Sequence, residues 1–308
     1  MSSNLTSKAV INQRKLWTVT RIKNLIINAL IYTFLLTIAL TCVIPFIHVF
    51  SKSISDEAYV IANKVILLPK GFTLEAYKKI FADTSILRSL YVSIILTTFF
   101  TLLGMMITIC AAYPLSRRNL KGRSIITFLF MFTMYFSGGI IPEYLLMNDL
   151  NLLDTWWALL LPLAFSPYNF LIMKATLQST ISDSLIESAV IDGASQFRIL
   201  RSIVIPLSKP IIATLSLFYA VGRWNAYQDA LFYIKQNTAL RPLQLKLYYL
   251  IVAATESFQT AAEGSAQYTS PEVLKASCIM FATIPIICIY PFVQKYFVQG
   301  TMIGAVKG

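Results

Sequence analysis

The chain has 308 residues, of which 56% are hydrophobic and 13% are charged, and its mean hydropathy is +0.66. The apolar residues gather into long blocks separated by charged connections, which excludes a soluble globular protein and indicates a polytopic membrane protein. The net charge of +12 comes from basic residues at the edges of those blocks, which is typical of topology determinants beside anionic lipid and does not indicate a nucleic-acid partner.

Six apolar runs are long enough to cross a membrane. A spanning helix needs about 20 mostly apolar residues, because only a helix satisfies its own backbone hydrogen bonds inside lipid. In chain order the runs are residues 25–50, 89–113, 124–147, 156–177, 203–232 and 276–298. The first run is too long and too far from the N-terminus for a signal peptide, so we expect it to remain in the mature chain. The sequence therefore predicts an all-α protein with six transmembrane helices.

Basic residues near the ends of these runs predict the orientation. The N-terminal arm, residues 1–24, carries five Lys or Arg residues, and the connection after the second run carries Arg117, Arg118, Lys121 and Arg123. Both belong in the cytoplasm, while the mixed or acidic connections 51–87 and 143–155 belong outside. We expect both termini to be cytoplasmic and residues 25–308 to form one transmembrane domain. Within it, residues 184–203 lie on the cytoplasmic face, and residues 233–275 form an outer surface loop.

The sequence offers few groups for metal, redox or hydrolytic chemistry. All four cysteines fall inside apolar runs without a CxxC pair, and His48 is the only imidazole, so neither a disulfide framework nor a zinc site is indicated. No GxxxxGK[ST] phosphate loop occurs, so we expect no ATP hydrolysis by this chain.

The polar segment between the fourth and fifth runs predicts two short helices. Ser184 and Glu187 have the spacing of a capping box, and Asp192-Gly193 is a breaker pair in which Gly193 suits a left-handed residue after a helix end. Ser195 then caps a second helix. Small residues on one face allow a close neighbour. Such an element either lies in the lipid headgroups or docks into a groove of another protein.

Several motifs resemble those of a known transporter family. Glu187-Ser188-Ala189, Asp192-Gly193-Ala194 and Ile205-Pro206 resemble, in order and spacing, the EAA loop of ABC importer permeases. Ser188 replaces the middle alanine, and Ile205 precedes the proline where leucine is commoner. The stretches "GRWNAYQDALFYI" and "YPFVQKYFVQGTMIGAVKG" are similar to carbohydrate-uptake permeases that resemble the second membrane subunit of the maltose system, especially the branch for complex oligosaccharides.

The resemblance implies a subunit of a binding-protein-dependent importer in a bacterial cytoplasmic membrane, carrying an oligosaccharide. Its partners would be a second related permease, two ATP-binding subunits and an extracytoplasmic solute-binding protein. ATP and Mg would bind to the partner subunits, and this chain would hold no cofactor. The coupling residues facing an ATPase subunit would be Glu187, Ser188, Ala189, Asp192, Gly193, Ala194, Phe197 and Pro206.

Two groups of residues are candidates for the substrate pathway. Tyr135, Gly138, Gly139 and Tyr144 accompany a break in the third run, where unwound backbone either lines a cavity or permits close helix packing with an aromatic belt. Trp224, Asn225 and Tyr227 lie in the fifth run, where they either face the pathway or serve helix packing. Asp229 nearby is expected to pair with a loop Lys or Arg.

Three alternative functions to this one differ in the residues that they require. An ABC importer for a non-sugar solute fits the same coupling motif. An ion-coupled secondary transporter usually shows inverted repeats and buried acidic groups, which are nearly absent here. A membrane-bound enzyme needs carboxylates or His gathered at one face, whereas the acids here are scattered through the connections.

Overall fold

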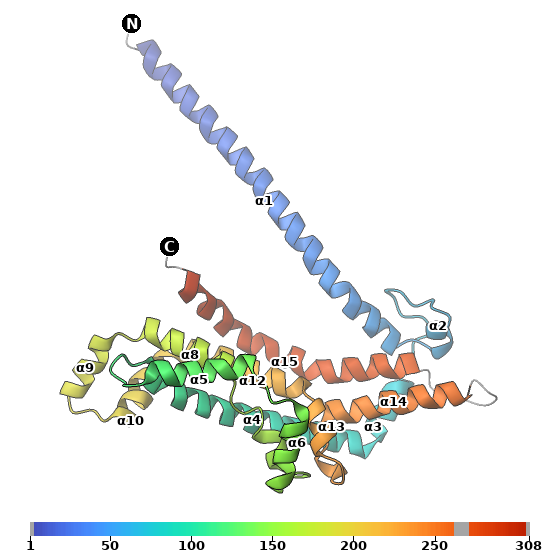
Figure 1. Ribbon diagram of the computed structural model, residues 1–308. Helices are drawn as coiled ribbons and strands as arrows, with labels where there is room; N and C mark the ends of the chain where they lie inside the picture. Colours follow the sequence, from blue (N-terminus) through green and yellow to red (C-terminus); the bar gives the residue numbers. More distant parts are fainter. Residues whose placement is uncertain (1–2, 262–270, 306–308) are drawn as a thin grey trace. The chain divides into compact units, whose positions relative to one another are not determined.

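The computed structural model describes residues 3–261 and 271–305, with side chains at residues 23–256, 271–289 and 291. Every regular element in this part is a helix, apart from an isolated antiparallel bridge between Ser55 and Phe72. The all-α prediction is therefore confirmed. The chain divides into two units, Met1–Leu74 and Glu75–Gly308, which are described separately (Figure 1).

The first unit contains α1, Ser3–Ser53, and the short α2, Glu57–Ile61. Residues Lys23–Ser53 of α1 are long and apolar enough to cross a membrane, as predicted for residues 25–50. The end of α1 is bonded to the following loop, because Ser51 Oγ donates to the Leu67 carbonyl at 2.6 Å and His48 Nδ1 lies 2.5 Å from the Ile66 carbonyl. His48 therefore helps to fix this loop.

The centre of the second unit is α4, Thr84–Ser116, which follows α3, Glu75–Ala82. With 33 residues, α4 is about 50 Å long. It packs mainly against α8, Pro167–Thr180, and α12, Lys209–Asn225, and α12 also packs against α15, Pro271–Ala305. The second and sixth predicted runs, residues 89–113 and 276–298, lie within α4 and α15 as continuous helix.

A close approach joins α4 to α12. A Cβ added at Gly104 would lie 2.9 Å from the Tyr219 ring and 3.0 Å from the Ala164 carbonyl oxygen. Tyr219 Oη is also 2.7 Å from Thr108 Oγ1, and it accepts a hydrogen bond from the Ser166 amide at 3.0 Å. Tyr219 thus links α4 and α12 to the start of α8, inside an apolar cluster that is built largely from these three helices.

The third predicted crossing is broken as the glycines suggest, so residues 124–147 are not one straight helix. Helix α5, Arg123–Tyr135, and helix α6, Ile140–Asp149, meet at an angle of 112°. Gly139 has φ +87°, a conformation that side-chain-bearing residues rarely adopt.

The prediction of one helix over residues 156–177 is wrong. The structure has α7, Trp156–Leu160, and then α8, separated by non-helical residues 161–166. Pro162 removes a backbone donor just after α7, and Pro167 occupies the first turn of α8, where the Ser166 side chain caps the helix. Two prolines five residues apart therefore divide this apolar run.

The prediction of one helix over residues 203–232 is also wrong. Helix α10, Gln196–Ile199, continues through a π-helical turn, η1, Leu200–Val204, and α11, Ile205–Leu207, before an 82° bend into α12. The Ile205 amide donates to the Leu200 carbonyl, five residues back, as in a π-helix. The next residue, Pro206, has no amide hydrogen to donate. Helix α12 ends at Asn225, and α13, Gln228–Tyr233, follows.

The prediction of a surface loop over residues 233–275 is wrong for its described part. After a 3₁₀ turn, η2, Thr238–Leu240, the chain forms α14, Leu243–Ala261, which packs against α4 and α15. Leu243, Leu245 and Leu247 are buried, and the Leu243 amide donates to Ser93 Oγ at 2.7 Å. Residues 262–270 lie outside the described residues.

Three helices in the described residues pass a length and hydropathy test for spanning a membrane: Lys23–Ser53, Thr84–Ser116 and Pro271–Ile289. Counting each of the two bent pairs, α5 with α6 and α10–α11 with α12, as one span raises the number to five. The broken α7–α8 run is the predicted crossing that does not appear among them.

Candidate functional site

The predicted helix–turn–helix forms at one end of the second unit (Figure 1). Helix α9, Asp183–Ile191, is followed by Asp192 and Gly193, which has φ +78°, and α10 then begins after Ser195. Ser195 caps α10 by accepting a hydrogen bond from the Arg198 amide at 3.3 Å. The predicted cap at Ser184 is wrong, because Ser182 accepts from the Leu185 amide and α9 begins two residues earlier. Ser182 follows Ile181, whose extended backbone ends α8.

This helix–turn–helix presents an exposed face of mixed character. Glu187, Ser188, Asp192, Gly193, Phe197 and Pro206 are exposed, while Ala189 and Ala194 are half-buried against the core. Large apolar side chains are exposed beside them, including Ile191 at 85% and Phe197 at 72%. Glu187 makes no ion pair with any residue whose side chain is described. The face thus carries a free carboxylate among apolar side chains, a combination suited to a protein contact.

The opposite face of the same segment is held to the helices behind it. Ile186 and Ile199 are buried in the cluster that includes residues of α4 and α8. Tyr113 Oη, near the end of α4, donates to Gln196 Oε1 at 3.0 Å. Asp183 lies 3.7 Å from an Arg117 Nη atom and 3.6 Å from Arg118 Nε. Helices α9 and α10 are therefore in contact with α4 and α8.

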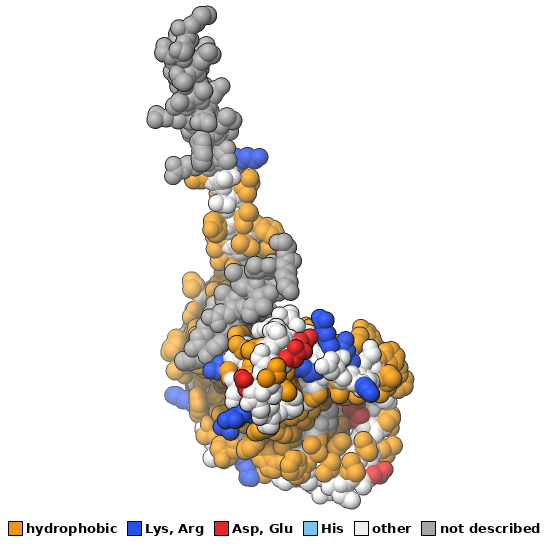
Figure 2. Space-filling view, turned by 90° about the vertical axis from the view of Figure 1, so that its left-hand side faces the viewer, with side chains coloured by type: hydrophobic (Ala, Val, Ile, Leu, Met, Phe, Trp, Pro, Cys, Tyr) orange, Lys and Arg blue, Asp and Glu red, His pale blue; other side chains and the backbone are white. Residues whose placement is uncertain are grey.

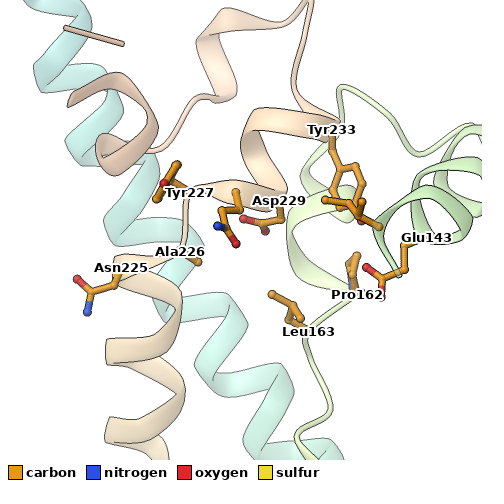
Figure 3. A pocket seen from close by; sticks show the side chains of 10 residues that line it. Glu143, Pro162, Leu163, Asn225, Ala226, Tyr227, Asp229 and Tyr233 are labelled. Atoms are coloured by element: carbon orange, nitrogen blue, oxygen red, sulfur yellow. The ribbon is translucent and has the colours of Figure 1, made fainter. Parts of the chain in front are cut away.

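A second candidate site lies at the far end of α12, where α12, α13, α6 and the segment after α7 surround a cavity of about 280 Å³. The cavity is lined by Ile140, Glu143, Pro162, Leu163, Asn225, Ala226, Tyr227, Gln228, Asp229 and Tyr233. Figure 3 shows Glu143, Tyr233 and Asp229 around a common space, with the Asn225 amide at the opposite end and turned away from Asp229. Carboxylates, amides and two tyrosine rings thus line an opening at a helix break, together with apolar side chains.

An ion pair that the sequence analysis did not find holds this break together. Arg223 donates to both carboxylate oxygens of Asp229, at 2.5 and 3.2 Å, and to the Leu159 carbonyl at 3.2 Å. The Arg223 side chain is 0% exposed and that of Asp229 is 10% exposed. The predicted partner of Asp229, a basic loop residue, is therefore wrong. The two residues are six apart on either side of the break between α12 and α13, so helical spacing gives no signal for the pair.

Three predicted pathway residues occupy different surroundings. Trp224 is buried, and its Nε1 donates to the Ala282 carbonyl of α15 at 3.1 Å, which is the packing alternative for this side chain. The amide of Asn225 donates to the Val221 carbonyl at 3.0 Å and is exposed. Tyr227 is half-buried and stacks on Tyr248 of α14, with ring centroids 5.3 Å apart. The structure thus brings Asn225 and Tyr227, but not Trp224, to the cavity.

Of the predicted pathway residues in the third run, some lie near the cavity and one does not. Tyr144 lies beside the cavity, because its ring stacks on that of Tyr233 with centroids 6.5 Å apart and its hydroxyl accepts a hydrogen bond from Lys235 at 3.2 Å. Gly138 and Gly139 form the break that turns α6 toward the cavity. Tyr135, in contrast, is 85% exposed at the end of α5 and does not line the cavity.

The Tyr233 hydroxyl is a hydrogen-bond donor on the cavity wall. Burial raises the pKa of the Tyr233 hydroxyl, and the Glu143 and Asp229 carboxylates raise it further, so the hydroxyl remains a donor at neutral pH. No group of three His, Cys, Asp or Glu side chains is placed to hold a metal ion in the part of the chain that the structure describes.

A further cavity, of about 430 Å³, lies along α12 on the other side of Ala226. Its lining includes Phe100, Asn169, Phe218, Tyr219, Gly222 and Arg223. It shares Leu163 and Ala226 with the first cavity, and the Arg223–Asp229 pair joins the lining of one to the lining of the other. The two cavities therefore adjoin each other near the end of α12.

Comparisons with known proteins identify the family. Residues 68–303 match the binding-protein-dependent transport system inner membrane components. The polygalacturonan/rhamnogalacturonan transport system permease protein YtcP of Bacillus subtilis (strain 168) is 44% identical over 287 residues, which cover 93% of this chain and 100% of that protein. Protein LplC of the same organism is 43% identical over 269 residues, covering 86% and 90% of the two chains.

A solved structure supports the same family assignment. A chain of a bacterial ABC transporter involved in the import of the acidic polysaccharide alginate has a TM-score of 0.77 and 35% identity, covering 88% of this chain and 96% of that one. The resemblance found in the sequence is thereby confirmed. The chain belongs to the family of binding-protein-dependent transport system inner membrane components and is a permease subunit of an ABC importer in a bacterial cytoplasmic membrane.

Proposed function

We propose that the imported substrate is an oligosaccharide, and that the first candidates to test are fragments of acidic polysaccharides. The observation that carries this proposal is the similarity, across nearly the whole chain, to a polygalacturonan/rhamnogalacturonan permease, together with the likeness to an alginate importer. The cavity at the end of α12 offers the chemistry that sugars need, namely aromatic faces and several hydrogen-bonding groups.

Tyr227 and Tyr233 line this cavity and supply rings for sugar faces, with Tyr144 stacked beside Tyr233, and Asn225 and Gln228 supply amides for hydroxyl groups. The Gly138–Gly139 break sets the position of α6. Trp224 acts through packing, since it fixes α12 against α15. Tyr135 lies on the exposed surface of α5 and does not contact the substrate in the cavity.

The proposed topology has six crossings with both termini in the cytoplasm. The crossings are α1 from Lys23, α4, the bent pair α5–α6, the broken pair α7–α8, α12 and α15. The basic connection from Arg117 to Arg123 supports this orientation, because such clusters stay on the cytoplasmic side. Helices α9 and α10 follow α8 and lie on that same side.

Energy enters from partner subunits in this proposal. Two ATP-binding subunits bind and hydrolyse ATP with Mg, a second related permease completes the pathway, and an extracytoplasmic binding protein delivers substrate. Glu187, Phe197 and the small residues between them dock into a cleft of one ATPase subunit. This chain contributes no cofactor.

The geometry offers a route from that docking surface to the cavity. Helices α9 and α10 are seated on α4 and α8, and the chain continues through the π-helical turn and the 82° bend into α12. The 17 residues of α12 span about 26 Å and end at Asn225, on the cavity wall. Closing the ATPase subunits moves α9 and α10, which tilts α12 and changes the access of the cavity, as alternating access requires.

Uptake by the bacterium that carries this chain tests the substrate class. Cells lacking the chain should lose uptake of radiolabelled oligogalacturonides or related acidic oligosaccharides and regain it when the chain is restored. Neutral oligosaccharides of the same length are the control substrates for the acidic ones. Unchanged uptake of every oligosaccharide, with loss of a peptide or inorganic ion instead, would favour an importer of a non-sugar solute.

A further inference from the structure

Three arginines surround a polar cavity beside the start of α9. Arg117 and Arg118 follow α4, Arg123 begins α5, and the cavity that they line has a volume of about 480 Å³. Gln178 of α8 and Ser182 complete a polar wall, and Asp183 is the one acidic residue in the lining. Figure 2 looks onto this end of the second unit and shows Lys and Arg side chains gathered beside a smaller acidic group. Three positive charges against one negative charge leave the cavity with an excess of two.

The guanidinium groups have more donors than the chain satisfies. Asp183 lies 3.7 and 3.6 Å from the nearest nitrogens of Arg117 and Arg118, beyond the distance of about 2.7–2.9 Å that is typical of a charge-assisted hydrogen bond. Arg123 donates to the Arg117 carbonyl at 3.4 Å. The Arg117 Nε atom is buried and has no acceptor in the described part of the chain. Since each guanidinium carries five N–H donors, these contacts leave several donors without a protein acceptor among the described residues.

We propose that this cavity binds a phosphate group, supplied by an anionic phospholipid headgroup or by inorganic phosphate. A tetrahedral oxyanion presents acceptors in several directions and can engage guanidinium groups that approach from different helices. A planar carboxylate suits the site less well, since Asp183 is already present and reaches only two of the three arginines, both at long distance. The cavity is also larger than a single carboxylate needs.

A bound phosphate competes with Asp183 for Arg117 and Arg118. Because Asp183 is the first residue of α9, this competition weakens the ionic attachment of α9 to the end of α4. The site thereby links local phosphate to the position of the helix proposed to contact the ATPase. The cytoplasmic location rests on the proposed topology, whereas the binding chemistry does not.

Native mass spectrometry on the purified full chain in an uncharged detergent tests the site. The probes are a short-chain phosphatidylglycerol and a diacylglycerol with the same acyl chains but no phosphate. We expect phosphatidylglycerol to bind and diacylglycerol to remain unbound. The double variant Arg117→Gln/Arg123→Gln should bind phosphatidylglycerol about tenfold more weakly, since charge-assisted hydrogen bonds are lost.

Arg201→Gln is the matched control, because Arg201 is exposed near the same end and does not line the cavity, and its binding should equal that of the wild type. Asp183→Asn keeps every arginine, removes the competitor and should bind several-fold more tightly. Displacement by equal concentrations of inorganic phosphate identifies the soluble ion as the ligand, and resistance to it identifies the lipid headgroup. Equal binding by wild type, the double variant and Asp183→Asn overturns the proposal, as does equal binding of the two probes.

Discussion

Removing one member of the Arg223–Asp229 pair is predicted to destabilise the end of α12. Asp229→Asn leaves the Arg223 guanidinium, which is 0% exposed, without its carboxylate partner. Breaking a buried ion pair in this way costs about 3–5 kcal/mol. The Leu159 carbonyl still accepts a hydrogen bond from Arg223, so we expect a value near the lower end, about 3 kcal/mol.

A double variant separates the stability lost with the ion pair from the stability lost by leaving a buried charge unpaired. Arg223→Met/Asp229→Leu replaces both charges by apolar groups, which is often neutral or stabilising at buried sites. We therefore expect the double variant to be more stable than Asp229→Asn and close to the wild type. The unit that contains the pair has more than 200 residues, so a loss of about 3 kcal/mol lowers its thermal midpoint by about 6–12 °C.

The measurement is the thermal midpoint of the detergent-solubilised chain, which fluorescence-detected size-exclusion chromatography of heated samples gives. Asp149→Asn is the matched control, because Asp149 is exposed and makes no ion pair with a described residue. A midpoint for Asp229→Asn equal to that of the control would refute the reasoning, and so would a double variant that is less stable than Asp229→Asn.

Three further variants test other parts of the structure. Glu187→Arg should abolish uptake while membrane fractionation shows normal insertion, because Glu187 is exposed and has no ionic partner within the described chain; failed insertion would make it a structural residue. Gly104→Ala should lower the thermal midpoint, since overpacking costs about 1–3 kcal/mol, whereas Gly222→Ala, whose Cβ would meet nothing within 4 Å, should not. Tyr227→Ala should raise the substrate concentration for half-maximal uptake several-fold, while Tyr227→Phe should stay near the wild-type value. If Tyr227→Ala also keeps the wild-type value, Tyr227 is not part of the site.

Local chemistry made part of the α9–α10 segment predictable. A left-handed Gly193 and a cap at Ser195 depend only on neighbouring residues, and both are present. The error at Ser184 arose because two serines stand two residues apart, and the capping-box spacing favoured the wrong one. The end of α8 at Ile181 decides between them, and that end depends on tertiary packing.

The helix breaks and buried contacts were harder to predict. Hydropathy treated the fourth and fifth apolar runs each as one helix, although Pro162 and Pro167 carried a local signal for the break before α8. Helix α14 fell within the predicted outer loop 233–275, because hydropathy finds only helices that are apolar enough to span lipid. Its first turns pack against α4 and α15 through the buried Leu243, Leu245 and Leu247. The Arg223–Asp229 pair crosses a helix break, so it depends on the path of the chain at Ala226, which no spacing rule supplies.

Co-purification is the most direct test of the account that α9 and α10 couple this permease to an ATPase. The tagged chain would be isolated in mild detergent from its own bacterium, with Gly193→Pro beside it, and the accompanying proteins identified by mass spectrometry. Gly193 has φ +78° and donates its amide to the Val190 carbonyl at 3.0 Å, and proline can do neither. We expect a second permease and an ATP-binding subunit with the wild type, and loss of the ATP-binding subunit alone with Gly193→Pro. Recovery of the ATP-binding subunit in equal amount with both chains would contradict it.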